Sequence, residues 1–217
     1  MQEIARISWF QKVISFLFPI VLKEIDSPLY IQFVLKNNKI LLNSQNANQS
    51  NGTLKYALHH AFSHFKWYEK TNVNQILILG FGLGSAYDLL SPIYPNAKFV
   101  GIENNEAIYN FYQNIKPYNS QLKLHLIDAQ DFITQCNDSF DLILIDIFND
   151  EEIPNFIIHP SFWEQCHQAL NPNGALLWNT LICNQIETKH PKIHEYFDTF
   201  WDTITSNRFY WKGKYRV

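Results

Sequence analysis

The residues best suited to chemistry begin with three closely spaced glycines, Gly80, Gly82 and Gly84, in the segment GFGLG. They follow a short apolar run at 76–79, and a later apolar run ends at Glu103. A strand, a glycine-rich turn, a helix, a second strand and a terminal acid make up the nucleotide-binding half of a doubly wound α/β domain. Because glycine carries no Cβ, such a turn can approach a ligand closely. The pattern predicts a nucleotide at this turn, with Glu103 accepting hydrogen bonds from the ribose.

Two more acids close later apolar runs. Asp128 follows 122–127, and Asp146 follows 142–145. Ligands of doubly wound sheets bind beyond the carboxyl ends of the strands, so both carboxylates are expected at the same edge as the glycine turn. Asp128 could accept a hydrogen bond from an adenine amine, with the backbone of Ala129 near the ring, and Asp146 would face the reacting end of the ligand. Each acid could instead cap the helix after its strand.

The glycine spacing distinguishes between two kinds of nucleotide. A dinucleotide-binding turn has the pattern GxGxxG, whose third glycine would fall at Ser85, but the third glycine here is Gly84. The resulting GxGxG favours S-adenosylmethionine over a nicotinamide dinucleotide. Acids after the third and fourth strands also suit an adenosyl amino acid, which has no pyrophosphate. The candidate ligand-binding residues are Gly80, Phe81, Gly82, Gly84, Glu103, Asn104, Asp128, Ala129 and Asp146.

Strand and helix patterns alternate from Gln75 onward. This alternation, with strands that are apolar on both faces, predicts a parallel α/β sheet of Rossmann type flanked by helices. The C-terminal segment predicts one more helix and a hairpin. The predicted strands are 76–79, 99–102, 122–127, 142–145 and 175–178; the helices are 85–93, 106–115, 130–136, 161–170 and 190–200; the terminal hairpin joins 201–205 to 208–211.

An N-terminal appendage at 1–52 is expected to precede the Rossmann-like domain at 53–217. Apolar residues at helical spacing predict a helix over 3–22, with Pro19 at its end or at a kink. Its most apolar stretch, 13–22, is too short to span a bilayer, which takes about 20 residues. No transmembrane segment is therefore predicted, and this helix is expected to pack on the domain or to form a homodimer contact.

The rest of the appendage predicts a β-hairpin. Two apolar runs, 29–35 and 39–42, flank Asn37 and Asn38, which are typical turn residues. A polar loop follows at 43–52. A helix is then expected from Thr53 to about Lys66.

Composition limits the classes of partner and compartment. The 217 residues carry a net charge of −3, so no global field attracts nucleic acid, and no nucleic-acid partner is expected. The three cysteines, Cys136, Cys166 and Cys183, form no CxxC pair, which is typical of a reducing, cytoplasmic setting. His60 and His64 have the spacing of a metal-binding pair, but no glutamate completes an HExxH motif, so no metal site is predicted.

The segment 141–179 resembles the spermidine synthase-like branch of the class I S-adenosylmethionine-dependent methyltransferase superfamily. In that family an aspartate after the fourth strand begins an acidic, proline-containing loop, and a helix and a P-x-G turn lead into the fifth strand. The resemblance implies a class I methyltransferase sheet flanked by helices, preceded by a small β-domain. The matching residues are Asp146, Asp150, Pro154, Ser161 at the helix start, and Pro172 to Gly174.

Two positions depart from the family pattern. The family's glycine turn resembles GGGDG, whose aspartate grips the amino group of decarboxylated S-adenosylmethionine, but Leu83 stands there in this chain. The family's loop after the fourth strand resembles DSSDP, and here it is DIFND. These departures favour methyl transfer from S-adenosylmethionine to a small-molecule acceptor, with Asp146 or Asp150 as the base. The alternatives are a polyamine aminopropyltransferase that uses decarboxylated S-adenosylmethionine at an altered donor site, and a non-catalytic protein that binds adenosyl ligands.

Overall fold

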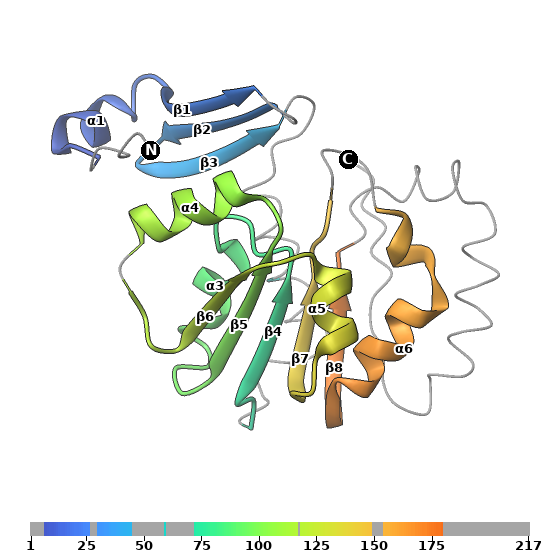
Figure 1. The fold of residues 1–217 in the computed structure, drawn as a ribbon. Coiled ribbons are helices and arrows are strands. Elements are labelled where there is room, and N and C mark those ends of the chain that lie inside the picture. Colours follow the sequence, from blue (N-terminus) through green and yellow to red (C-terminus); the bar gives the residue numbers. More distant parts are fainter. Residues whose placement is uncertain are drawn as a thin grey trace.

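Five parallel strands form the central sheet in the order β6-β5-β4-β7-β8 (Figure 1). The chain builds outward from β4 to β6 and then returns to the other side of β4, so the strand order reverses between β4 and β7. The predicted α/β sheet is confirmed, although its last strand begins earlier than expected. The computed structural model describes residues 7–26, 30–44, 59, 72–116, 118–148 and 154–179. The strands are β4 (Gln75–Leu79), β5 (Lys98–Glu103), β6 (Leu122–Leu126), β7 (Phe140–Ile145) and β8 (Leu170–Trp178).

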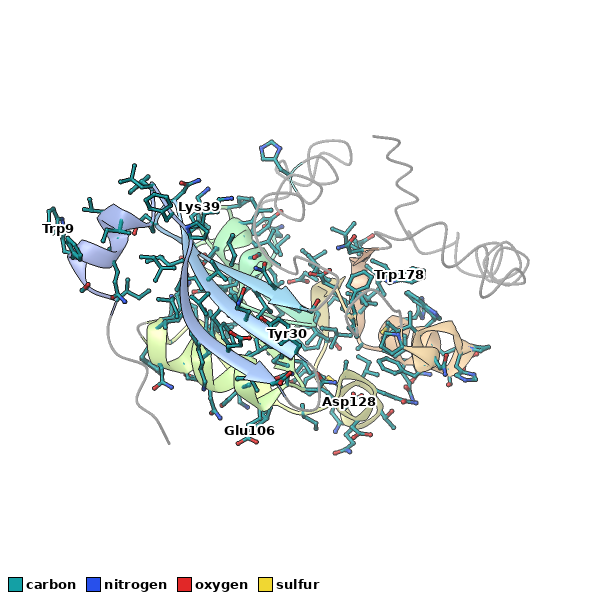
Figure 2. All side chains as sticks on the ribbon, turned by 90° about the horizontal axis from the view of Figure 1, so that it is seen from above. Trp9, Tyr30, Lys39, Glu106, Asp128 and Trp178 are labelled. Carbon is teal, nitrogen blue, oxygen red and sulfur yellow. The ribbon has the colours of Figure 1, made fainter. Side chains whose placement is uncertain are left out.

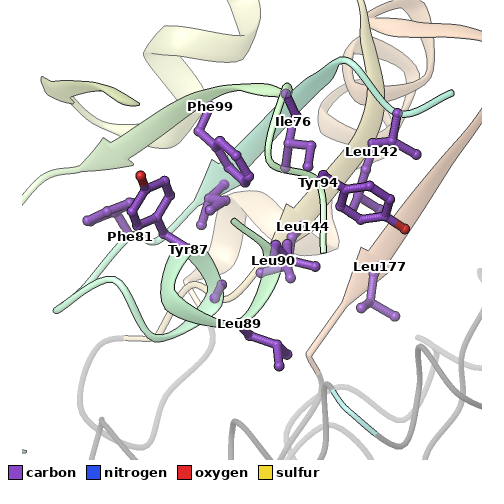
Figure 3. Packing of buried hydrophobic residues seen from close by; sticks show 14 of the residues in the cluster. Ile76, Phe81, Tyr87, Leu89, Leu90, Tyr94, Phe99, Leu142, Leu144 and Leu177 are labelled. Atoms are coloured by element: carbon purple, nitrogen blue, oxygen red, sulfur yellow. The ribbon is translucent and has the colours of Figure 1, made fainter. Parts of the chain in front are cut away.

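Helices cover both faces of this sheet because successive strand residues point to opposite sides. Ile76 and Ile78 pack in the cluster that includes α3 (Figure 3), whereas Leu77 and Leu79 pack with α5 and α6. All four side chains are fully buried, as expected of a parallel strand covered on both faces. The helices are α3 (Ser85–Leu90), α4 (Glu106–Ile115), α5 (Ala129–Gln135) and α6 (Pro160–Gln168), and a short 3-10 helix, η2 (Asn155–Ile158), precedes α6.

A second, smaller sheet precedes the central one. In it β1 (Ile20–Asp26) pairs antiparallel with β2 (Tyr30–Lys36), which pairs with β3 (Lys39–Ser44). The predicted hairpin is confirmed as β2 and β3. Asn37 and Asn38 at its tip have φ values of 52° and 58°, the left-handed conformation that a two-residue type I′ turn requires.

The helix predicted over 3–22 is wrong for residues 20–22, which begin β1. The observed helix is α1 (Trp9–Ile14), which begins after a capping box between Ser8 and Gln11. From Ile20 onward the chain instead completes its backbone hydrogen bonds with β2. The spacing of apolar residues could not predict this strand. Its formation depends on pairing with β2, which lies further along the chain.

The small sheet packs on α4 and on the glycine turn. The ring of Phe33 stacks on that of Phe111, with centroids 3.8 Å apart and an interplanar angle of 11°. Leu83, in the middle of the glycine turn, is only 7% exposed and belongs to the same buried cluster, together with Leu42 and Ile108. The side chain that departs from the family pattern therefore fills the seam between the two sheets.

Several predictions fall on residues outside the described ranges. They concern most of the polar loop predicted at 43–52, the helix at 53–66 with His60 and His64, Asp150, and the elements at 190–211. Residues 43 and 44 of the predicted loop are described and instead end β3. Within the described ranges, no three His, Cys, Asp or Glu side chains are grouped so that they could hold a metal ion. Nor does the described part of the chain contain a helix with the length and apolar character needed to cross a membrane.

Candidate functional site

The glycine turn between β4 and α3 is held against β5 by backbone hydrogen bonds. The N–H groups of Gly80 and Phe81 both donate to the carbonyl of Ile102, at 3.1 and 2.8 Å. Gly80, Gly82 and Gly84 have φ values of 83°, 56° and 79°. Glycine adopts this left-handed region without steric cost, so the shape of the turn favours glycine at all three positions.

The space around Gly80 differs from the space around Gly82. A Cβ on Gly80 would lie 2.7 Å from the carbonyl carbon of Asp146, so the ends of β4 and β7 touch there. Among the described residues, a Cβ on Gly82 would have no atom within 4 Å. Gly80 is therefore required by the packing of the protein on itself, whereas Gly82 borders space that a ligand could enter.

Glu103 ties this turn to the start of α4. Its side chain is 7% exposed, and its two oxygens accept the N–H groups of Gly82 at 2.8 Å and Asn105 at 2.9 Å. Burial raises the pKa of Glu103, and the hydrogen bonds from Asn105 and Gly82 oppose the rise. Each carboxylate oxygen has a further lone pair, so these two hydrogen bonds are compatible with ribose binding by Glu103, which stays a prediction.

Replacing Glu103 with glutamine should lower the free energy of unfolding by about 1–3 kcal/mol, because an amide nitrogen would then face a backbone N–H. It should also weaken the binding of adenosine ligands. Urea unfolding and calorimetry measure the two effects. Glu106→Gln makes the same change on an exposed residue in the first turn of α4 and should change both quantities much less. Equal stability of Glu103→Gln and the wild type would contradict this role of the carboxylate.

Asp128 lies at the end of β6 and also caps α5. Its Oδ1 accepts the N–H of Gln130 at 2.8 Å, and its Oδ2 accepts from the side-chain amide of Asn104 at 3.3 Å. Asn104 is exposed at this edge, while Ala129 is buried beneath it. Helix capping and ligand binding are compatible here, because each Asp128 oxygen has a further lone pair. Adenine recognition by Asp128 stays a prediction.

The side chain of Phe81 lies in the core and not toward the predicted ligand. Its ring packs edge-on against Tyr112, with centroids 4.9 Å apart, and lies near Tyr87 (Figure 3). A Cβ on Gly101 of β5 would lie 2.9 Å from the Cε2 atom of Phe81, so a glycine in the neighbouring strand makes room for the ring. Phe81 could therefore contact a ligand only through its backbone.

Asp146 follows β7 and is held by a residue at the end of β8. Its Oδ1 accepts the side-chain N–H of Asn179 at 2.7 Å, and the backbone N–H of Asn179 donates to Ile145 at 2.8 Å. Burial raises the pKa of Asp146 to about 6, and the nearby charge of Glu103 adds to the rise, while the bond from Asn179 opposes it. Asp146 can thus exchange a proton close to neutral pH.

Asn179 was not among the residues singled out from the sequence. The available signal is a polar residue directly after a predicted strand, the same signal that identifies Asp128 and Asp146. The predicted last strand ends at residue 178, so Asn179 occupies the equivalent position. Its side chain is buried, and its bond to Asp146 makes it part of the site.

The structure therefore gathers most of the predicted residues at the carboxyl edge of the sheet. Gly80 contacts Asp146, Gly82 donates to Glu103, and the charge of Glu103 acts on Asp146. Asp150 lies outside the described residues, so its part as a base stays a prediction. The arrangement joins an acid placed to bind hydroxyl groups with a carboxylate that could accept a proton from a reacting group.

Known proteins include sequence relatives of this chain and structures with a similar fold. No family model matches the chain. It is 27% identical over 135 residues to a probable polyamine aminopropyl transferase of Bifidobacterium longum, covering 62% of this chain and 29% of that protein. It is 28% identical over 118 residues to a polyamine aminopropyltransferase of Vibrio vulnificus, covering 52% of this chain and 39% of that protein.

A probable spermidine synthase structure from Corynebacterium glutamicum superposes with a TM-score of 0.59 at 16% identity, over 70% of this chain and 61% of that one. The fold is that of the class I methyltransferase superfamily, and the sequence is similar to the spermidine synthase branch of that superfamily.

A spermidine synthase structure from Thermotoga maritima supports the same fold, with a TM-score of 0.54 at 14% identity over 70% of this chain and 54% of that one. This spermidine synthase-like chain spans about a third of the length of the two curated relatives named above. Their alignments show sequence similarity over 62% and 52% of this chain. The position of Leu83, buried in the seam with the small sheet, is the main feature by which its site departs from the family pattern.

Proposed function

We propose that this spermidine synthase-like chain transfers an alkyl group from an adenosyl sulfonium donor to a small amine. Aminopropyl transfer from decarboxylated S-adenosylmethionine is the first candidate, because the relatives are named aminopropyltransferases. The observation that carries the proposal is Asp146, a carboxylate with a pKa of about 6 at the carboxyl end of β7, fixed by Asn179 and in contact with the glycine turn.

The residues present fit such a donor. The open space beside Gly82 would admit it, and the remaining lone pairs of Glu103 would accept its ribose hydroxyls. Asp128, next to Asn104, would accept from the adenine amine. When bound, the sulfonium supplies a carbon that is activated toward displacement.

Asp146 supplies the base in this scheme. The nitrogen of the amine forms a bond to the carbon, the carbon–sulfur bond breaks, and its electron pair stays on sulfur as the neutral thioether methylthioadenosine. The proton lost by the amine passes to Asp146. Asn179 holds the carboxylate in place, so its part is positioning.

Methyl transfer from S-adenosylmethionine is the second candidate, and a specific observation favours it. At the position where the family pattern has an aspartate for the donor's amino group, the Leu83 side chain is buried with Phe33 and Phe111. The glycine turn therefore offers no carboxylate of its own to the amino end of a donor, and binding an ammonium there without a partner would be unfavourable.

Calorimetric titration of one preparation with S-adenosylmethionine, its decarboxylated form and methylthioadenosine tests the first candidate. We expect the decarboxylated donor to bind about tenfold or more tightly than S-adenosylmethionine, a difference of about 1.4 kcal/mol. Incubation with that donor and a small diamine should then release methylthioadenosine. Preference for S-adenosylmethionine would overturn aminopropyl transfer in favour of methyl transfer. Tight binding without product from any acceptor would support a non-catalytic adenosyl-binding protein.

A further inference from the structure

An unusual group of exposed apolar side chains covers α1 and the turn that follows it. Trp9 is 76% exposed and Leu17 is 74% exposed, although soluble proteins rarely expose large contiguous apolar patches. Figure 2 shows Trp9 projecting outward from α1, beyond the small sheet. We call this group the N-terminal apolar patch; its members are Trp9, Phe10, Val13, Phe16, Leu17, Phe18 and Val21.

Hydrogen bonds between Ser15 and the hairpin tip attach the patch to the small sheet. Helix α1 itself has no buried residue. Ser15 is buried at its end, where its carbonyl accepts the N–H of Asn37 at 2.8 Å and its hydroxyl oxygen accepts the N–H of Asn38 at 2.9 Å. The hairpin tip thus anchors the turn while the aromatic side chains around it stay exposed.

Lysines border most of the patch, and the exposed acid nearest to it among the described residues is Glu24 of β1, three residues after Val21. The segment from residue 7 to residue 23 contains Lys12 and Lys23 and no acid. The hairpin tip, which is bonded to Ser15, adds Lys36 and Lys39, both exposed, and residues 33–42 contain no acid either. Lys39 lies at the end of β3 nearest α1 (Figure 2). The patch is therefore aromatic in the middle and basic at its rim.

We propose that the N-terminal apolar patch binds the surface of an anionic lipid bilayer. Aromatic side chains favour the boundary between headgroups and acyl chains, and lysines around them attract anionic headgroups. A second copy of this chain fits less well, because a two-fold contact through the patch would bring its lysines together, and of the described residues near the patch only the acids of β1, Glu24 and Asp26, could pair with them. The contact would be peripheral, since α1 is only six residues long.

Co-sedimentation of the full chain with vesicles tests this proposal. We expect binding to vesicles containing phosphatidylglycerol, weakening in high salt, and little binding to pure phosphatidylcholine. Phe16→Ser with Phe18→Ser should weaken binding about tenfold or more, because less apolar area enters the interface. Tyr118→Ser is the matched control: it removes a side chain that is 92% exposed on the loop after α4 and should leave binding unchanged.

A charge pair tests the basic rim separately. Lys36→Glu with Lys39→Glu should weaken vesicle binding about 30-fold or more. Lys98→Glu with Lys123→Glu makes the same change on two exposed lysines of the central sheet and should have a much smaller effect. Thermal unfolding confirms that each variant is folded.

Three outcomes would overturn the proposal. The first is no vesicle binding by the folded wild type. The second is binding that Phe16→Ser with Phe18→Ser leaves unchanged. The third is a dimer, seen by light scattering, that these two substitutions convert to a monomer while vesicle binding is absent. That result would assign the patch to a second copy of the chain.

Discussion

Gly80→Ala should lower the free energy of unfolding by about 3 kcal/mol or more. A left-handed φ of 83° costs a non-glycine residue about 1–2 kcal/mol, and overpacking typically adds about 1–3 kcal/mol. The added Cβ would meet the backbone of Asp146, which cannot rotate away as a flexible side chain could. Urea unfolding monitored by fluorescence measures the change. A variant as stable as the wild type would show that the ends of β4 and β7 are not in close contact.

Gly82→Ala is the matched comparison in the same turn. Its Cβ would meet no atom within 4 Å, so only the cost of the left-handed backbone, about 1–2 kcal/mol, is expected. Gly82→Ala should nevertheless weaken ligand binding strongly, because the added methyl group points into space that the donor would occupy. Calorimetry on the folded variant should therefore show a large loss of affinity. Unchanged affinity would move the ligand away from Gly82.

Asp146→Asn should reduce turnover by about 10²–10⁴-fold, the usual contribution of a general base. In the wild type, kcat/KM should fall as the pH drops through about 6, where Asp146 becomes protonated, and this limb should vanish in the variant. Asp141→Asn is the control at the opposite end of β7. Asp141 accepts the backbone N–H groups of Asn74 and Gln75, so its loss should lower stability without removing the pH limb. Full turnover by Asp146→Asn would exclude Asp146 as the base.

Asp146→Asn should also make the protein more stable than the wild type at pH 8. Folding raises the pKa of Asp146 from 3.8 to about 6, so the folded state binds this proton more tightly than the unfolded state does. The wild type therefore loses stability as the pH rises from about 4 to above 6, by about 1–2 kcal/mol after allowance for partial solvent exposure. Asparagine carries no charge and avoids this loss. The stability difference between Asp146→Asn and the wild type should vanish near pH 4, which unfolding at the two pH values would show.

The sequence patterns predicted the central sheet well because local signals agreed with the tertiary structure. Helix α4 has the predicted bounds, and Asn105 caps it by accepting two backbone N–H groups. Glu103, Asp128 and Asp146 can be located because each stands at the end of a predicted strand. The edge at which they meet then follows from the parallel topology.

The errors came from contacts between residues far apart in the sequence. Whether 20–26 forms a helix or a strand depends on its pairing with β2, and the apolar spacing of the segment is compatible with either. The core position of the Phe81 ring depends on Gly101, which lies in the next strand. Leu83 was noted as a missing acid, but its packing partners in the small sheet could not be inferred from the motif alone.

The burial of Leu83 makes the glycine turn and the small sheet depend on each other for their packing. This leucine is the only residue between Gly82 and Gly84, and its side chain lies in the cluster with Phe33 and Phe111. If the small sheet swings away from α4, Leu83 loses its packing and the backbone on either side of it is freed. Opening of the small sheet and loosening of the ligand-facing turn should therefore occur as one event. If the proposed transfer takes place, release of its product would then depend on strands that contribute no group to the chemistry.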